Sequence, residues 1–216
     1  MNQINYQKEL EKILAGLEKK SVEEKSTDKE APSLFLHSCC APCSSYVLEY
    51  LCPYFRITVF YYNPNISASE EYQKRVAEQK RLISSYNREN KGYPIEVVEG
   101  DYEPEKFFEL AKGYESCPEG GERCFRCYDM RLRETAKRAK EGRFDYFATT
   151  LTISPLKNAQ KLNEIGEKLS AEYGVTWLPS DFKKKDGYKR SIELSAEYGL
   201  YRQNYCGCAF SKAQFL

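Results

Sequence analysis

The chain has 216 residues, 41% of them hydrophobic and 30% charged, with a formal net charge of +1. These values fit one globular domain, and the balanced charge excludes a protein-wide field for nucleic acid, so RNA binding would need a local basic patch. The chain has no apolar run of about 18 residues that could span a membrane and no signal peptide at its start, which predicts a cytoplasmic protein without a membrane partner.

The first 30 residues are predicted to stand apart from the rest of the chain. Apolar residues recur at helical spacing between positions 10 and 17, which predicts a helix over about residues 5–19. The charged segment that follows is poor in apolar residues and is predicted to be a linker. We therefore expect a helix and linker over residues 1–30 and a single α/β catalytic domain over residues 31–216.

Beyond residue 30, short apolar runs alternate with amphipathic helical patterns. This alternation is typical of a mostly parallel sheet with helices on both faces, so the predicted fold is α/β and Rossmann-like. Ligands of such sheets bind at the carboxyl ends of the strands. The predicted strands are 34–37, 57–63, 93–101, 144–152 and 175–179, and the predicted helices are 44–51, 70–90, 104–114, 125–142, 159–174 and 189–199.

The chain has two cysteine groups before its C-terminal segment, and the first of them lies where such a fold would place a site. Stable disulfides are disfavoured in a reducing compartment, and clustered cysteines there bind metal or carry redox chemistry. One group forms a C-C-A-P-C loop directly after the first strand, and a C-x-x-C pair begins a predicted helix, whose free amides favour thiolates. The candidate metal-binding cysteines are Cys39, Cys40, Cys43, Cys124 and Cys127.

The spacing of these cysteines favours an iron–sulfur cluster over a single ion. A site with four thiolates suits either zinc or an iron–sulfur cluster. Two C-x-x-C pairs would indicate structural zinc, but the first group has adjacent cysteines, which a wider cluster of several irons accommodates better. Zinc, and thiols that are catalytic or simply buried, stay open as alternatives.

A third cysteine group lies near the C-terminus. Cys206 and Cys208 flank a single glycine, and a disulfide closed over so short a span is strained and therefore easily reduced. A redox-active pair is thus predicted, with further metal ligation as the alternative.

Three other features bear on a site. Asp129 lies beside the C-x-x-C pair and is a candidate metal or active-site residue, while His37, the only histidine, is expected to be hydrogen-bonded at the end of a buried strand. Basic residues interleaved with tyrosines follow position 181, a composition that suits an RNA backbone with unstacked bases; a solvated charged loop is the alternative. The candidate RNA-binding residues are Lys183, Lys184, Lys185, Arg190 and Arg202.

Five segments, in order and without large gaps from Leu34 to Phe210, together resemble the QueH type of epoxyqueuosine reductase. Each is modest alone, and the combination is specific. The segments are HSCCAPCSSYVLEYL, YYNPNI, ERCFRCYDMRL, TTLTISPLKN and YRQNYCGCAFS.

The resemblance implies a reaction on tRNA. Such enzymes reduce epoxyqueuosine at the wobble position of the anticodon to queuosine, without cobalamin, with electrons from a donor such as ferredoxin or flavodoxin. Their fold is similar to that of nucleotide-hydrolase-like enzymes, among them tRNA thiolases. The SGGxDS nucleotide loop of those relatives is replaced here by HSCCAPCS, so ATP use is not expected.

The resemblance also implies roles for the cysteines. Cys39, Cys40, Cys124 and Cys127 would hold a [4Fe-4S] cluster, and the 206/208 pair would be redox-active. An additional iron beside the cluster is expected, with Cys43, the 206/208 pair and a nearby carboxylate as candidate ligands. The competing hypotheses are a cluster-dependent tRNA thiolase and a zinc-stabilised RNA-binding module without catalysis.

Overall fold

A five-stranded sheet forms the centre of the computed structural model, which describes residues 4–23 and 31–212. All strand pairs are parallel and the strand order is β3-β2-β1-β4-β5, so the predicted α/β fold is confirmed. The order reverses between β1 and β4, and such a switch point opens a crevice at the carboxyl ends of the strands. The strands are β1 Ser33–His37, β2 Arg56–Tyr61, β3 Glu96–Glu99, β4 Tyr146–Thr149 and β5 Thr176–Trp177.

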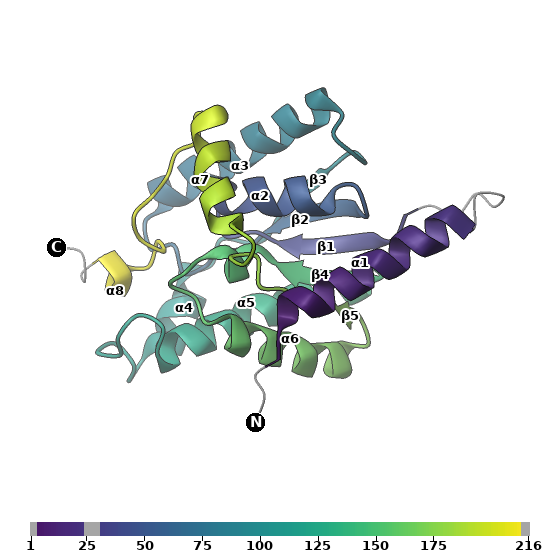
Figure 1. Cartoon of the computed structure of the whole chain (residues 1–216). Coiled ribbons are helices and arrows are strands. Elements are labelled where there is room, and N and C mark those ends of the chain that lie inside the picture. Colours follow the sequence, from purple (N-terminus) through teal and green to yellow (C-terminus); the bar gives the residue numbers. More distant parts are fainter. Residues whose placement is uncertain (1–3, 24–30, 213–216) are drawn as a thin grey trace.

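Helices cover both faces of this sheet (Figure 1). Helices α2, α3 and α7 lie on one side, and α4, α5 and α6 lie on the other. A 3₁₀ turn, η1, follows β4 directly, and a short helix, α8, that the sequence did not predict ends the described part. The bounds are α2 Ala41–Leu51, α3 Ser69–Glu89, α4 Pro104–Ala111, α5 Glu122–Glu141, η1 Thr150–Ile153, α6 Ala159–Tyr173, α7 Gly187–Glu197 and α8 Ala209–Lys212.

Strand β1 shows why both faces of the sheet need a cover. Its side chains point alternately to opposite faces, so Leu34 and Leu36 enter the core below α2, whereas Phe35 enters the core below α5 and α6. All three are 3% exposed or less. A strand buried on both faces reads as a continuous apolar run, which is the pattern that identified it in the sequence.

Helix α1, Tyr6–Glu23, packs on this domain. Leu10 and Leu14 join the core on the α2 side, and Gln7 Nε2 donates a hydrogen bond to Tyr50 Oη in α2 at 3.2 Å. The predicted linker at residues 24–30 lies outside the described residues. None of the helices within the described ranges has the length and apolar character needed to cross a bilayer.

Two helix starts differ from the prediction, and both bear on the cysteines. The C-C-A-P-C segment is not only a loop, because α2 already begins at Ala41 with a proline in its first turn, where a missing N–H costs nothing. Cys40 is therefore the N-cap residue and Cys43 lies in the first turn. Helix α5 likewise begins at Glu122, so Cys124 lies in its first turn.

Candidate active site

The first cysteine group converges on one point beyond β1. The sulfurs of Cys39, Cys40 and Cys43 all lie within 4.8 Å of one another, with Cys40 Sγ 2.9 Å from Cys43 Sγ and 3.8 Å from Cys39 Sγ. Thr150, just after β4, anchors the loop, because its Oγ1 accepts a hydrogen bond from the Cys39 amide at 3.2 Å. The site therefore lies at the carboxyl end of β1, where the alternation pattern predicted it, and the strand order makes this the switch point between β1 and β4.

The three thiols cannot easily ionise together. Hydrogen bonds from Cys40 and Cys43 hold the pKa of Cys39 well below its usual value, and hydrogen bonding to Cys39 raises the pKa of both neighbours. One thiolate is thus favoured and the next two are opposed, since like charges at this distance repel. A bound cation removes that penalty because it stabilises each thiolate that ligates it.

The other two cysteine groups line a small cavity of about 20 Å³. Cys124 and Cys127 line it from α5, and Cys206 and Cys208 line it from the C-terminal segment. The sulfurs of the last pair are 3.4 Å apart and unbonded. Cys124 also packs in the same apolar cluster as Cys39, so all three groups border one region, although only the first meets the close spacing of an ion site within the described residues.

A buried guanidinium lies between the groups. Arg131 is 3% exposed; its Nε donates to His37 Nε2 at 3.2 Å, and its Nη2 donates to Asn63 Oδ1. No ion pair joins it to a carboxylate among the described residues, whereas the thiols of Cys39, Cys127 and Cys206 lie close enough to interact with its charge when they ionise. A buried cation needs a compensating charge, and thiolates or an anionic cluster would supply it here.

Lys157 provides a second buried cation. Its side chain is 9% exposed and its Nζ lies 2.8 Å from Glu119 Oε1, while Ser211 Oγ donates to Glu119 Oε2 at 3.0 Å. The hydrogen bond from Cys208, aided by the charge of Lys157, lowers the pKa of Cys206 to about 5. Cys206 is therefore the more acidic thiol of its pair.

These groups open onto a larger cavity of about 320 Å³. Arg131, Lys157 and Cys206 border both cavities, and Tyr188 and Arg202 line the larger one on the α7 side. The large cavity is lined by cations, aromatic rings and thiols, a combination that suits a planar polar ligand attached to an anionic backbone.

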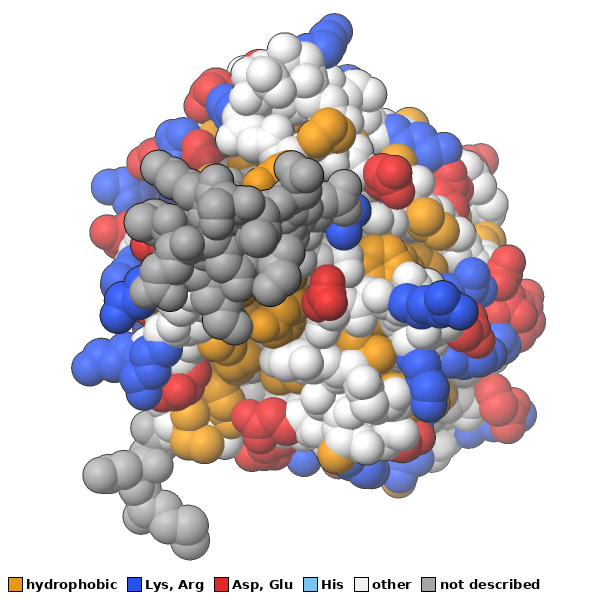
Figure 2. Space-filling model, turned by 90° about the vertical axis from the view of Figure 1, so that its right-hand side faces the viewer, with side chains coloured by type: hydrophobic (Ala, Val, Ile, Leu, Met, Phe, Trp, Pro, Cys, Tyr) orange, Lys and Arg blue, Asp and Glu red, His pale blue; other side chains and the backbone are white. Residues whose placement is uncertain are grey.

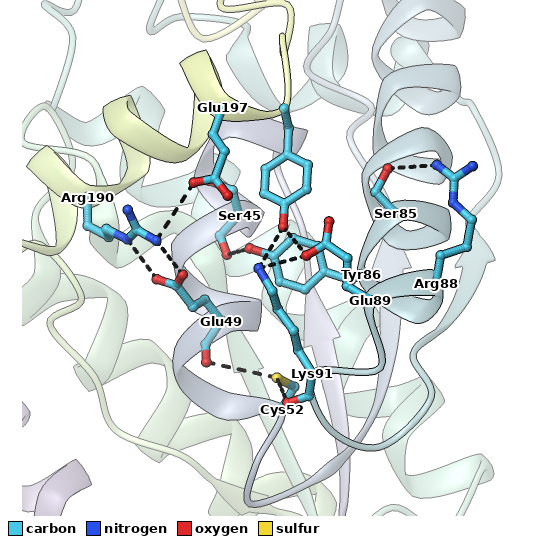
Figure 3. A network of polar contacts seen from close by, with 11 residues as sticks. Ser45, Glu49, Cys52, Ser85, Tyr86, Arg88, Glu89, Lys91, Arg190 and Glu197 are labelled. Atoms are coloured by element: carbon cyan, nitrogen blue, oxygen red, sulfur yellow. Dashed lines mark hydrogen bonds and ion pairs between the residues drawn. The ribbon is translucent and has the colours of Figure 1, made fainter.

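The basic segment predicted to bind RNA is only partly available. Lys183 pairs with Asp181, Lys185 pairs with Glu11 of α1, and Arg190 makes two bonds to Glu49 of α2, at 2.7 and 3.0 Å (Figure 3). Lys184 is exposed, and Arg202 faces the large cavity. Part of the basic segment therefore forms salt bridges that connect the region of α7 to α1 and α2.

Two further predicted residues have identifiable places. Asp129 Oδ2 accepts a bond from Arg133 Nε on α5 at 3.2 Å and is not among the residues that line either cavity. His37 is fully buried and hydrogen-bonded, as expected, and burial lowers its pKa to about 3. It is therefore neutral, with Nδ1 2.8 Å from Thr149 Oγ1 and Nε2 3.1 Å from the carbonyl oxygen of Tyr62 and 3.2 Å from Arg131 Nε.

A family model described as Epoxyqueuosine reductase QueH matches residues 34–214. A protein of that name from Staphylococcus epidermidis is 45% identical over 210 residues, which cover 96% of this chain and 84% of the relative. This chain belongs to the QueH family. QueH relatives from Streptococcus pyogenes and Thermotoga maritima are 43% and 35% identical, covering 96% and 83% of this chain and 78% and 90% of their own lengths.

The residues that the family model matches include all nine cysteines and both cavities, whereas α1 lies before them.

Sequence reasoning alone missed several residues of the site. Lys157 lies in the TTLTISPLKN segment, so the resemblance pointed to it without a role. Arg75 on α3 gave a weaker signal: it occupies a position of the buried stripe formed by Tyr72, Val76 and Leu82, where a charge is unexpected.

Proposed function

We propose that this chain reduces the epoxide of epoxyqueuosine, at the wobble position of a tRNA anticodon, to the cyclopentene of queuosine. The observation that carries the proposal is the meeting of three cysteine groups and three buried cations, Arg75, Arg131 and Lys157, beside a cavity of about 320 Å³, in a chain of the QueH family. The reaction consumes two electrons and two protons and releases the epoxide oxygen as water.

The residues present fit an iron–sulfur centre. Three thiols already converge, and Arg131 lacks a carboxylate partner within the described part of the chain, so an anionic centre would complete its surroundings. We infer that Cys39, Cys40, Cys124 and Cys127 hold a [4Fe-4S] cluster. Cys43, Cys206 and Cys208 remain for an additional iron or for thiol redox chemistry. When bound, such a cluster supplies electrons one at a time.

The protein's own groups would prepare the substrate for reduction. Lys157 and Arg131 direct fixed positive charge into the cavity, where charge develops on the oxygen as its bond to carbon breaks. The pKa of Lys157 is raised, because its negative neighbours outweigh the effect of burial, so it stays charged and acts by electrostatic stabilisation rather than by giving up its proton. Cys43 and Cys206 also line the cavity and lie outside the inferred cluster ligands, so they are the thiols placed to reach the substrate.

The large cavity would receive the modified base, and Arg202 at its border would contact the RNA backbone. Tyr188, which is 38% exposed and also lines the cavity, offers a ring on which a base can stack. A soluble donor such as ferredoxin or flavodoxin would supply electrons.

The decisive assay combines colour with product. Protein purified without oxygen should be brown, contain iron, and convert epoxyqueuosine-containing tRNA to queuosine-containing tRNA in the presence of a reductant, with the loss of one oxygen seen by nucleoside mass spectrometry. A colourless protein with stoichiometric zinc, or a tRNA that keeps its oxygen, contradicts the proposal.

Replacing Cys124 with Ala should remove both colour and activity, because the remaining thiols cannot complete the inferred ligand set. Cys52→Ala is the matched control. Its thiol lies away from the site, beside Glu49 and Lys91 (Figure 3), so that variant should keep iron and activity. A Cys124→Ala protein that retains both would show that the ligand set is wrong.

A further inference from the structure

The segment that carries the third cysteine group, residues 206–208, is held as a tight hairpin against the turn after β2. Ser67 N donates a hydrogen bond to Gly207 O at 3.1 Å, and Ala209 N donates to Ser67 Oγ at 2.9 Å. Asn65 Nδ2 donates to Cys206 O at 3.4 Å. We call residues 206–208 the CGC hairpin. Its binding surface, the dock, is formed by residues 65–67, at and just after the end of the YYNPNI segment.

Arg75 closes the dock from α3. Its side chain is 2% exposed; Nε donates to Glu71 Oε1 at 2.7 Å and Nη1 donates to Cys206 O at 3.2 Å. Its guanidinium carbon also lies 5.3 Å from the centre of the Tyr205 ring, within the range of a cation–π contact. The buried guanidinium of Arg75 therefore contacts both the carbonyl oxygen of Cys206 and the ring of Tyr205.

The same face of α3 also fixes the chain that leads into the hairpin. Tyr201 N donates to Glu78 Oε1 at 2.6 Å, and Tyr201 Oη donates to Glu71 Oε2 at 3.2 Å. Lys74 Nζ lies 3.5 Å from the centre of the Tyr201 ring. Because residues 198–208 form neither helix nor strand, side-chain contacts of this kind decide where the hairpin lies.

Gly207 shows how close the approach is. Its φ is +108°, which L side chains rarely adopt, and a Cβ there would lie 2.8 Å from Ile66 Cγ1 and 3.2 Å from Arg75 Nη1. Glycine thus allows the hairpin backbone to rest directly on the dock.

We propose that Arg75 is a positioning residue that, with the turn at residues 65–67, holds the CGC hairpin so that Cys206 faces both cavities. Its effect on activity rests on the proposed function, whereas its effect on the hairpin does not. Arg75 Nη2 is buried and has no partner among the described residues, so the guanidinium also keeps a donor free beside the first cysteine group, with which it shares the large cavity.

Hydrogen exchange of the full chain, purified without oxygen, tests the proposal. In Arg75→Gln, amides of residues 201–211 and Ser67 should exchange about tenfold faster than in the wild type, since a buried charge-assisted bond is lost. Strands β1 and β2 should exchange at the wild-type rate. Arg88→Gln is the control, because that exposed arginine of α3 touches Ser85 of its own helix (Figure 3).

Activity gives an independent readout. Arg75→Gln should lower kcat about tenfold or more with little change in KM for tRNA, because the cavity stays open while a reacting thiol is misplaced. Unchanged exchange in residues 201–211, or equal acceleration in the strands, overturns the proposal. If Arg75→Gln does not fold, Gly207→Ala must accelerate the same amides instead, and unchanged exchange there likewise overturns it. Because exchange is measured without substrate, it gives an answer even if the wild type makes no queuosine.

Discussion

At the scale of single residues, the site is defined by its buried charged side chains. Arg75, Arg131 and Lys157 are all buried or nearly so, and each is costly unless it is compensated. Glu119 compensates Lys157 and Glu71 compensates Arg75, but Arg131 has only thiols and neutral acceptors. Because Arg131 alone of the three lacks a carboxylate partner, we expect the compensating negative charge to come from the cysteines around it.

Glu119 yields a prediction about acid stability. Burial alone would raise its pKa, but Lys157 and the bond from Ser211 lower it overall from the usual 4.5. The unfolded chain therefore takes up this proton at a higher pH than the folded protein, so the contribution of Glu119 is present above about pH 4.5 and is lost as pH falls through the folded-state pKa.

Glu119→Gln should thus be less stable than the wild type at pH 7, by about 1.5–3 kcal/mol, and the difference should shrink as the pH falls below about 4.5. Denaturant titrations of both proteins at several pH values measure it. Glu122→Gln, whose partner Arg126 is exposed, should show almost no difference at any pH. A gap for Glu119→Gln that stays constant with pH would contradict the linkage.

At the scale of elements, α1 lies before the residues that the family model matches, 34–214. The sequence predicted the helix, and the structure shows that Leu10 and Leu14 are buried in the core. The domain division at residue 30 stays a prediction, because residues 24–30 lie outside the described ranges. The contacts of α1 with α2 and with Lys185 nevertheless indicate that it stabilises the face of the domain below α7.

Leu10→Ala should lower the free energy of unfolding by about 2–5 kcal/mol, because it leaves a cavity at a fully buried position. Lys12→Ala, on the exposed side of the same helix, should change it by about 0.5 kcal/mol or less. Urea titration of the full chain distinguishes them. Equal, small effects would show that α1 does not contribute to the stability of the core.

At the scale of the whole molecule, charge is balanced and RNA binding must be local. On the face seen in Figure 2, Lys and Arg side chains are interspersed with Asp and Glu side chains, consistent with the net charge of +1. The cations that face the large cavity are therefore the best candidates for phosphate contacts, and the paired lysines of the basic segment are weaker ones.

Salt dependence of tRNA binding tests this distinction. Arg202→Ala should weaken binding and reduce the slope of log K against log salt by about 0.7, the value for one phosphate contact on a single strand. Lys185→Ala should leave the slope unchanged, because that lysine already pairs with Glu11. If instead Lys185→Ala reduces the salt slope and Arg202→Ala does not, the RNA backbone lies along the basic segment and not along the cavity.

The amino-acid sequence by itself determined the α/β class, the position of the first cysteine group at the carboxyl end of a strand, and the family. These follow from local patterns: strand and helix periodicities, and thiol spacings within a few residues. Only the tertiary structure decided which charges are buried, how α1 packs, and what holds the CGC hairpin. Arg75 gives only a weak signal in the sequence, its place on the apolar stripe of a helix, and its contacts arise because residues 65–67 and 201–208 pack against it. Burial depends on partners that are distant in sequence, and local periodicity does not specify them.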